Sequence, residues 1–249
     1  GLIYGVSDSY KTTQAMSLAM YVYEKYGKRT RFISAENAAM QIVAPYVDVG
    51  VVEPLWLTRG SHPRSALKKL VRGEWPKAIN TPAGPKLQWA PTEDWSKIGG
   101  YVFEGYQSIG ELIMMDVVAS GRKVQEEVVG KYEEEGELLA AAARSHYWLA
   151  QGDIAFLIKE STTELPRVSN GNVKVVWGIT HESKGEDDVT KATVFGPAVV
   201  GKALTHKIQK DLGTVIHTEI RYEGAGAARK KVVEAYFMSH PDSENASII

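Results

Sequence analysis

The chain opens with an apolar run, a segment of helical periodicity and a second apolar run. Residues 2–4 (LIY) are typical of a buried strand, and Gly5 follows as the start of a tight loop. Over residues 12–26 apolar side chains recur every three or four positions, as on the buried face of a helix, and Gly27 supplies its stop. Residues 29–36 (RTRFISAE) predict a second strand. This order predicts a βαβ unit with parallel strands and a right-handed crossover.

Strand and helix patterns continue to alternate along the rest of the chain. Residues 73–97, with four prolines and three tryptophans and little periodicity, predict an irregular surface segment, and the charged stretch 183–192 predicts a mobile loop. The further predicted helices cover 37–47, 61–71 with Ser61 as cap, about 108–117 with Ser108 as cap, 138–156 and 202–212. The further predicted strands cover 51–57, 100–104, 173–180, 214–222 and 230–239.

Alternating strands and helices predict an α/β fold with a mostly parallel, twisted sheet flanked by helices. In such sheets, ligands bind beyond the carboxyl ends of the strands. We expect one domain over residues 1–249, with 58–97 as an irregular insertion and 214–239 as a C-terminal β-hairpin.

The composition excludes several kinds of chemistry. Of 249 residues, 44% are hydrophobic and 24% charged, which is ordinary for a globular protein. A formal net charge of −1 gives no global attraction to nucleic acid or anionic membrane, so DNA contact would need a local patch or repeated subunits. The absence of cysteine excludes disulfides and thiolate chemistry and fits an intracellular protein. No apolar run approaches the roughly 20 residues of a membrane span. Because the chain enters a strand at once, we expect it to be part of a longer protein.

Residues 5–12 (GVSDSYKT) nearly match the phosphate-binding pattern G-x-x-x-x-G-K-[ST]. Lys11 and Thr12 fit it, but Tyr10 replaces the second glycine. That position typically needs a positive φ, which a bulky residue adopts at a cost of about 1–3 kcal/mol, so Tyr10 either strains the loop or reshapes it. Asp8 places a carboxylate beside backbone N–H groups that bind anions. The pattern therefore predicts a damaged phosphate loop, with Tyr10 either filling the phosphate pocket or serving as a platform for a base. We expect glycine at both positions to tighten Mg-ATP binding by a factor of about ten or more.

Acidic and polar residues close three further predicted strands. Glu36 follows the second strand, Glu104 ends YVFE, and Thr180 and His181 end WGIT and begin the segment after it. Since the carboxyl ends of parallel strands meet at one edge of a sheet, we expect these residues to lie beside the loop at 5–12.

Three stretches resemble one known family. FISAENAAMQIVAPYVDVG resembles the segment after the second strand of RecA-type recombinases, and GVSDSYKTT and YVFEG stand before and after it in the same order. With VFGPAVVGKALTHKIQKDLG, the chain resembles the compact RecA-like P-loop ATPases of bacteriophages, a group associated with single-strand annealing. The resemblance covers most of residues 1–240, with 58–97 matching poorly. It implies a RecA-like P-loop NTPase fold, ATP with Mg²⁺ as cofactors, and assembly into homo-oligomers.

The resemblance also implies roles for particular residues. Lys11 would reach the β- and γ-phosphates, and Thr12 would ligate Mg²⁺. Glu36 would be the catalytic residue that orients or deprotonates the attacking water. Glu104 stands where the family has a Mg²⁺-associated aspartate, one methylene shorter. The nucleotide-binding set it implies is Gly5, Ser7, Ser9, Lys11, Thr12, Thr13, Thr180 and His181, the last two as a sensor of the γ-phosphate.

Ordinary structural roles remain open for several of these features. Glu36 equally suits a helix cap, Glu104 a strand end, and His181 a loop. Trp75, Trp89 and Trp95 suit either base stacking or the anchoring of a loop. The basic groups at 64–72 and 229–231 suit either a DNA-facing or neighbour-facing patch or a solvated surface.

Two functions follow. The first is a nucleotide-binding protein of phage type, with weak or no hydrolysis, acting in single-stranded DNA handling and recombination. The second is an inactive pseudo-ATPase that serves as an assembly subunit of a phage particle or replication complex. The partners implied are further copies of the chain, single-stranded DNA or phage proteins, with no membrane. The location implied is the host cytoplasm or the phage particle.

Overall fold

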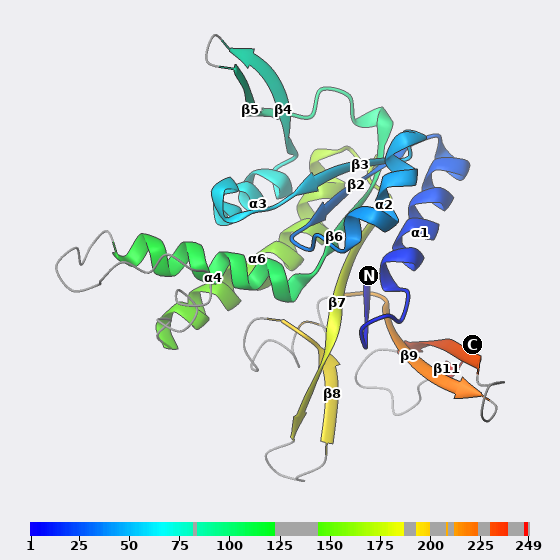
Figure 1. Ribbon diagram of the computed structural model, residues 1–249. Coiled ribbons are helices and arrows are strands. Elements are labelled where there is room, and N and C mark those ends of the chain that lie inside the picture. Colours follow the sequence, from blue (N-terminus) through cyan, green and yellow to red (C-terminus); the bar gives the residue numbers. More distant parts are fainter. Residues whose placement is uncertain are drawn as a thin grey trace.

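The computed structural model describes residues 1–81, 84–122, 144–186, 193–199, 208, 212–223, 230–238 and 247–248 (Figure 1). The helices are α1 (Lys11–Tyr26), α2 (Ala39–Asp48), α3 (Pro63–Val71), α4 (Tyr106–Arg122) and α6 (Arg144–Val168), with short 3-10 helices η1 (Arg59–Ser61) and η2 (Trp95–Lys97). The strands are β1 (Leu2–Gly5), β2 (Arg29–Ser34), β3 (Val52–Trp56), β4 (Glu74–Thr81), β5 (Gly84–Pro91), β6 (Ile98–Glu104), β7 (Val175–Glu186), β8 (Thr193–Pro197), β9 (Val215–Glu223), β10 (Lys230–Met238) and β11 (Ser247–Ile248).

Nine strands of the described chain form one sheet, in the order β11-β10-β9-β1-β7-β6-β2-β3, with β8 paired to β7. The strands from β9 to β3 run parallel, whereas β8, β10 and β11 pair antiparallel. From β1 the chain crosses to β2 and β3 on one side, and after β7 it passes to β9 on the other side of β1. A crevice at the carboxyl ends of the strands is expected where the direction of winding reverses in this way. The predicted α/β class is confirmed.

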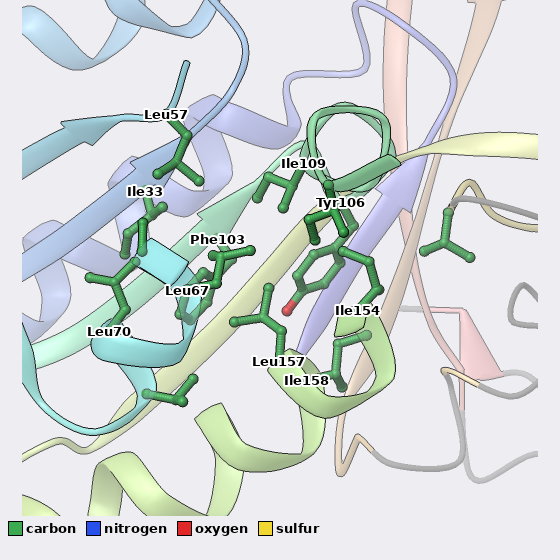
Figure 2. Close-up of a cluster of buried hydrophobic side chains, with 14 of the residues drawn as sticks. Ile33, Leu57, Leu67, Leu70, Phe103, Tyr106, Ile109, Ile154, Leu157 and Ile158 are labelled. Carbon is green, nitrogen blue, oxygen red and sulfur yellow. The ribbon is translucent and has the colours of Figure 1, made fainter. Parts of the chain in front are cut away.

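The two faces of the sheet hold separate cores because successive strand residues point to opposite sides. Phe32 and Val102 face α1 and α2, where they pack in one buried cluster. Ile33 and Phe103 face the other side, where α3, α4 and α6 cover the larger cluster (Figures 1 and 2). Both faces of the inner strands β1, β2 and β6 are therefore buried, which leaves the ends of these strands open to a ligand.

The strands predicted at 2–4, 29–36, 100–104 and 173–180 correspond to β1, β2, β6 and β7, and they are parallel neighbours as expected. The predicted C-terminal hairpin is also confirmed, since β9 and β10 pair antiparallel along their whole length. The bounds of α2 and β3 differ from the predicted 37–47 and 51–57 by one or two residues.

The prediction that residues 73–97 are irregular is wrong. β4 and β5 pair antiparallel as a two-stranded sheet that projects from the body (Figure 1). Trp75 is buried at its base, with the Arg31 guanidinium 4.4 Å from the ring centroid. Pro76 and Pro85 obscured these strands in the sequence. In a two-stranded ribbon each strand has one free edge, where a proline without an N–H is tolerated.

Both serines predicted as helix caps have other roles. Ser61 ends η1 and hydrogen-bonds to the carbonyl of Thr58, while α3 starts after His62. Ser108 lies inside the first turn of α4, and its hydroxyl donates to Glu36 Oε1 at 3.0 Å. In both cases the predicted start was two residues from the observed one, which is the usual uncertainty of a helix boundary.

Two elements extend further than predicted. The helix predicted at 138–156 continues as α6 to Val168, and β7 continues to Glu186, so the first part of the charged stretch 183–192 is strand. Residues 138–143 and 187–192, most of the helix predicted at 202–212 and the turn between β9 and β10 lie outside the described residues.

Among the helices of the described residues, none combines the length and the apolar character needed to cross a bilayer.

Candidate functional site

A cavity of about 510 Å³ opens at the carboxyl ends of β1, β2, β6 and β7. The loop between β1 and α1, the start of α2 and one residue of β10 complete its wall. Its lining residues are Ser7, Asp8, Ser9, Tyr10, Lys11, Thr12, Thr13, Glu36, Ala38, Ala39, Ile42, Glu104, Gly105, Ile179, Thr180, His181 and Lys231. The residues that the sequence placed at four strand ends therefore meet at this cavity, although Thr180 and His181 lie inside β7, which continues to Glu186.

The β1–α1 loop holds two non-glycine residues with positive φ. Asp8 (φ 61°) and Tyr10 (φ 57°) both lie in the left-handed region, so of the two alternatives for Tyr10 the structure has the strained backbone. The other non-glycine residues with positive φ in the described chain lie far from the loop. At Gly5 a side chain is excluded for a different reason: an added Cβ would come 2.1 Å from the Thr218 carbonyl oxygen of β9.

Tyr10 does not fill the cavity. Its side chain is 55% exposed and lies at the edge of the cavity. Because Tyr10 already holds a positive φ in the free protein, glycine there would relieve strain in the free and bound states alike. The tighter binding expected of a variant with glycine at positions 8 and 10 therefore has to come from removal of the Asp8 charge. Glycine at position 10 is expected to change the stability of the fold instead.

Lys11 begins α1 and is 7% exposed. Its ammonium donates to the carbonyls of Gly5 (3.1 Å) and Val6 (2.7 Å) and to Ser9 Oγ (3.4 Å). Burial lowers the pKa of this ammonium, while Glu104 and Glu36 partly oppose the shift. A cation at the first turn of a helix, where the macrodipole is also positive, is favourable for an anionic ligand.

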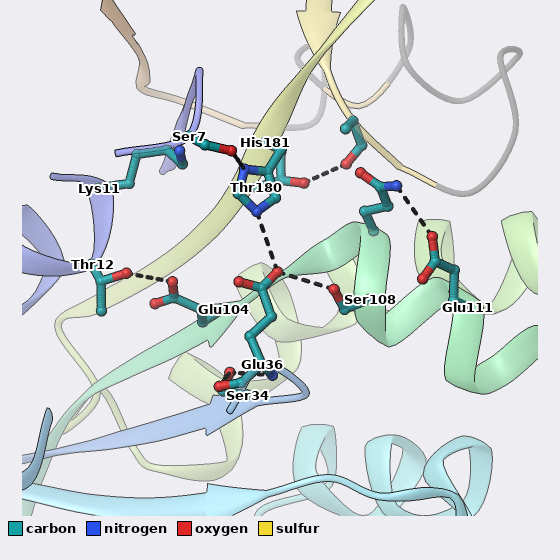
Figure 3. Close-up of polar contacts among 12 residues, drawn as sticks. Ser7, Lys11, Thr12, Ser34, Glu36, Glu104, Ser108, Glu111, Thr180 and His181 are labelled. Atoms are coloured by element: carbon teal, nitrogen blue, oxygen red, sulfur yellow. Dashed lines mark hydrogen bonds and ion pairs between the residues drawn. The ribbon is translucent and has the colours of Figure 1, made fainter. Parts of the chain in front are cut away.

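Thr12 and Glu104 form a direct pair in the cavity (Figure 3). Thr12 Oγ1 donates to Glu104 Oε1 at 2.5 Å, and the extra methylene of glutamate allows this contact. Glu104 is 4% exposed, and its other oxygen, Oε2, is buried without a hydrogen-bond partner among the described residues. Burial raises the pKa of Glu104 to about 7. An unpaired buried carboxylate oxygen is costly, so the pair suits a hard cation that takes oxygen ligands.

Glu36 lies opposite this pair, at the end of β2 (Figure 3). Its Oε1 accepts from Ser108 Oγ at 3.0 Å and is 3.7 Å from His181 Nε2. The facing His181 imidazole lowers the pKa of Glu36, against the opposing effect of burial. Gly105 permits this placement, since a Cβ there would come 2.4 Å from Glu36 Oε1. Glu36 is therefore an ionised carboxylate held in one orientation by two side chains.

The remaining predicted residues differ in what they can offer a ligand. Ser9 is buried and its hydroxyl is engaged by Thr218 Oγ1 (2.7 Å) and the Val6 carbonyl, so this side chain shapes the loop. The Thr180 hydroxyl donates to the Ala198 carbonyl, so it is committed to the protein.

Two further predicted residues, Ser7 and Thr13, are exposed at the cavity, and Ser7 Oγ lies 3.5 Å from His181 Nδ1. Of the two predicted sensor residues, His181 is thus the one that faces both the loop and Glu36.

The sequence did not reveal three residues of the site. Ser108 was interpreted as a cap, Lys231 as part of a surface patch, and Ile42 as an ordinary helix residue. Ile42 lines the cavity although it is 40% exposed, which gives an apolar wall to an otherwise polar site. An apolar residue in the first turn of the helix that follows the strand-end carboxylate Glu36 was the available signal for Ile42. No local pattern indicates the other two.

No protein-family model and no curated protein sequence matches the chain. Among solved structures it is similar to a KaiC-like protein of the archaeon Pyrococcus horikoshii OT3, with 12% identity, 100% of this chain and 81% of that chain covered, and a TM-score of 0.43. It is also similar to the RadB recombinase, with 11% identity, 97% and 80% covered, and a TM-score of 0.49.

A third similar structure is the flagellar accessory protein FlaH from Methanocaldococcus jannaschii, with 11% identity, 94% and 76% covered, and a TM-score of 0.41. Identities and scores this low carry no statement about activity or partners, which rest on the site itself.

Proposed function

We propose that this chain is a RecA-like P-loop protein that binds ATP with Mg²⁺ in the cavity at the carboxyl ends of its parallel strands. One observation carries the proposal. The ammonium of Lys11, the Thr12–Glu104 pair and the oriented carboxylate of Glu36 surround one cavity, although they come from β-strand ends and a helix start far apart in the sequence. Such a combination is what phosphoryl-transfer sites use to hold phosphates, a metal ion and a water.

The residues present fit Mg²⁺. Thr12 contributes a hydroxyl oxygen and Glu104 a carboxylate whose Oε2 is buried and unpaired among the described residues. Mg²⁺ prefers such oxygen ligands, completed by water and phosphate oxygens. Bound there, the ion would neutralise charge on the phosphates and favour the ionised form of Glu104. Lys11 would exchange its loop carbonyl contacts for phosphate oxygens, and Glu36 would orient a water.

Hydrolysis is expected to be slow. A carboxylate whose pKa is lowered, as at Glu36, is a weak proton acceptor. Asp8 adds negative charge beside the loop. We expect Mg-ATP to bind, and turnover to lie well below the roughly 1–100 s⁻¹ of competent phosphoryl-transfer enzymes. Calorimetric titration with ATP, with and without Mg²⁺, and a steady-state phosphate-release assay test both statements. Absence of Mg-ATP binding would refute the proposal, and rapid turnover would refute the expectation of slow hydrolysis.

Removal of the Asp8 charge is expected to strengthen Mg-ATP binding about three- to tenfold, since two unit charges about 4 Å apart interact by about 1 kcal/mol when water screens them, as at this exposed loop. Asp8→Asn is the suitable change because asparagine tolerates the left-handed backbone that Asp8 holds. Asp48→Asn at the end of α2 makes the same change in net charge away from the cavity. Paired binding isotherms at equal salt give the answer, and equal affinities of the two variants would contradict it.

The resemblance to phage RecA-like ATPases favours a role in single-stranded DNA handling, with nucleotide binding linked to assembly of several copies in the host cytoplasm. The basic residues at 64–72, on and just after α3, support DNA contact poorly. Arg64 pairs with Asp153 at 2.5 Å, and the Lys69 ammonium lies 5.5 Å from the Trp89 ring centroid. This gives weight to the second candidate, a pseudo-ATPase with an assembly role, in a phage particle or a replication complex. Anisotropy of a labelled oligonucleotide and the sedimentation of the protein, each with and without Mg-ATP, separate the two.

A further inference from the structure

We propose that Lys231, on β10 of the C-terminal hairpin, is a phosphate-binding residue of this site, supplied by the same chain. The inference rests on the proposed binding of Mg-ATP and names a further ligand for its phosphates. It also makes the hairpin β9–β10 the element that responds to nucleotide binding.

Lys231 reaches the cavity from a distant part of the sequence. It lines the cavity, its ammonium donates to the Asp8 carbonyl at 2.7 Å, and the same ammonium lies 5.0 Å from the centroid of the Tyr10 ring. Both contacts are to the loop that would hold the phosphates. The aromatic ring of Tyr10 thus gives the Lys231 ammonium a contact that glycine at position 10 would not provide, because ammonium groups are attracted to aromatic faces.

The charges around the cavity indicate why a second ammonium is needed. Asp8, Glu36 and Glu104 line the wall with carboxyl groups. Among the described lining residues, the ammonium groups are those of Lys11 and Lys231. With Lys11 alone, the lining would carry three carboxyl groups against one ammonium, which disfavours a triphosphate. Lys231 reduces this excess from two groups to one, next to the Asp8 backbone.

The contacts of Lys231 leave it able to change partners. An ammonium has three donors, and the Asp8 carbonyl accepts one of them. Exchange of this neutral carbonyl for a phosphate oxygen replaces a neutral acceptor with a charged one, which forms the stronger hydrogen bond. The Lys11 ammonium, by contrast, is turned onto three loop oxygens beneath the loop. The two lysines therefore approach the loop from different elements.

The hairpin is well placed to respond when Lys231 changes partner. β9 pairs in parallel with β1, and Gly5 packs directly against Thr218. Thr218 Oγ1 is also hydrogen-bonded to Ser9 Oγ at 2.7 Å, inside the loop. Lys231 pairs across the hairpin with Tyr222, so its backbone position is fixed by both strands. Ligand binding at the loop would thus be transmitted to the C-terminal hairpin through β9 and Lys231.

Four variants test the assignment. Lys231→Gln keeps a hydrogen-bond donor but removes the charge, and Lys231→Arg keeps the charge. Lys230→Gln is the matched control, because Lys230 is exposed and is the neighbour of Lys231 on β10, where successive side chains point to opposite faces. Lys11→Ala reports on the nucleotide site as a whole. Circular dichroism and thermal unfolding establish that each variant is folded.

We expect Lys231→Gln to weaken Mg-ATP binding about tenfold and to reduce its dependence on salt, since one ionic contact is lost. Lys231→Arg should stay within about threefold of the parent, and Lys230→Gln should match it. Parental affinity in Lys231→Gln would overturn the inference and leave the proposed function standing. An equal loss in Lys231→Arg, together with lowered thermal stability, would also overturn it, because Lys231 would then be a structural anchor. A parent protein that binds no Mg-ATP would refute both.

Discussion

Replacement of Lys11 by alanine is expected to weaken Mg-ATP binding by about 100-fold or more. Charge-assisted hydrogen bonds are each worth about 1.5–3 kcal/mol, and Lys11 would make such bonds to two phosphates. The buried ammonium already points into the loop, so it needs only to exchange the Gly5 and Val6 carbonyls for phosphate oxygens. Isothermal titration at fixed Mg²⁺ and salt measures the change.

The matched control for this variant is Lys25→Ala. Lys25 lies in the last turn of the same helix, α1, where its ammonium contacts Tyr21 rather than the cavity. Both variants lose one positive charge, so a general electrostatic effect would weaken binding in both. A loss confined to Lys11→Ala identifies the loop lysine as the ligand. Unchanged affinity in Lys11→Ala would show that ATP, if bound, lies elsewhere.

Replacement of Glu104 by glutamine is expected to remove a pH dependence of fold stability. The pKa of Glu104 is about 7 in the folded protein, above its ordinary value of 4.5. Between these two values the folded state keeps a proton that the unfolded state has released, so stability falls as pH rises through this window. From pH 5 to pH 8 the parent should lose about 2–3 kcal/mol that Glu104→Gln retains.

Urea unfolding at the two pH values, in the absence of Mg²⁺, measures this difference. Glutamine keeps an acceptor for the Thr12 hydroxyl, so the variant isolates the charge. Glu24→Gln, an exposed carboxylate on α1, serves as control and should follow the parent. Mg²⁺ should stabilise the parent at pH 8 more than it stabilises Glu104→Gln. Equal pH dependence in the parent and in Glu104→Gln would contradict the burial of an unpaired carboxylate at the end of β6.

Glu36 and Glu104 illustrate why the sequence located the site without defining its chemistry. Both were found because they end apolar strands, and parallel strands place such ends together. Their pKa values shift in opposite directions, since burial dominates at Glu104 and the His181 imidazole dominates at Glu36. Two residues of one type in equivalent positions thus acquire different properties. Their pKa values differ because different side chains face the two carboxyl groups, and these side chains come from other elements of the fold.

The sequence alone determined the strand–loop–helix unit, the acidic residues that close parallel strands, and the choice at Tyr10 between a strained and a reshaped loop. These features are local, because apolar periodicity and the phosphate-loop pattern act within a few residues of the chain. It did not determine the β4–β5 ribbon, whose prolines are tolerated only because both strands have a free edge.

Only the tertiary structure brought Ser108 to Glu36 and Lys231 to Asp8, across 72 and 223 residues of sequence. Contacts over such separations depend on the register of the sheet and on the packing of its helices. No pattern within a single segment encodes them.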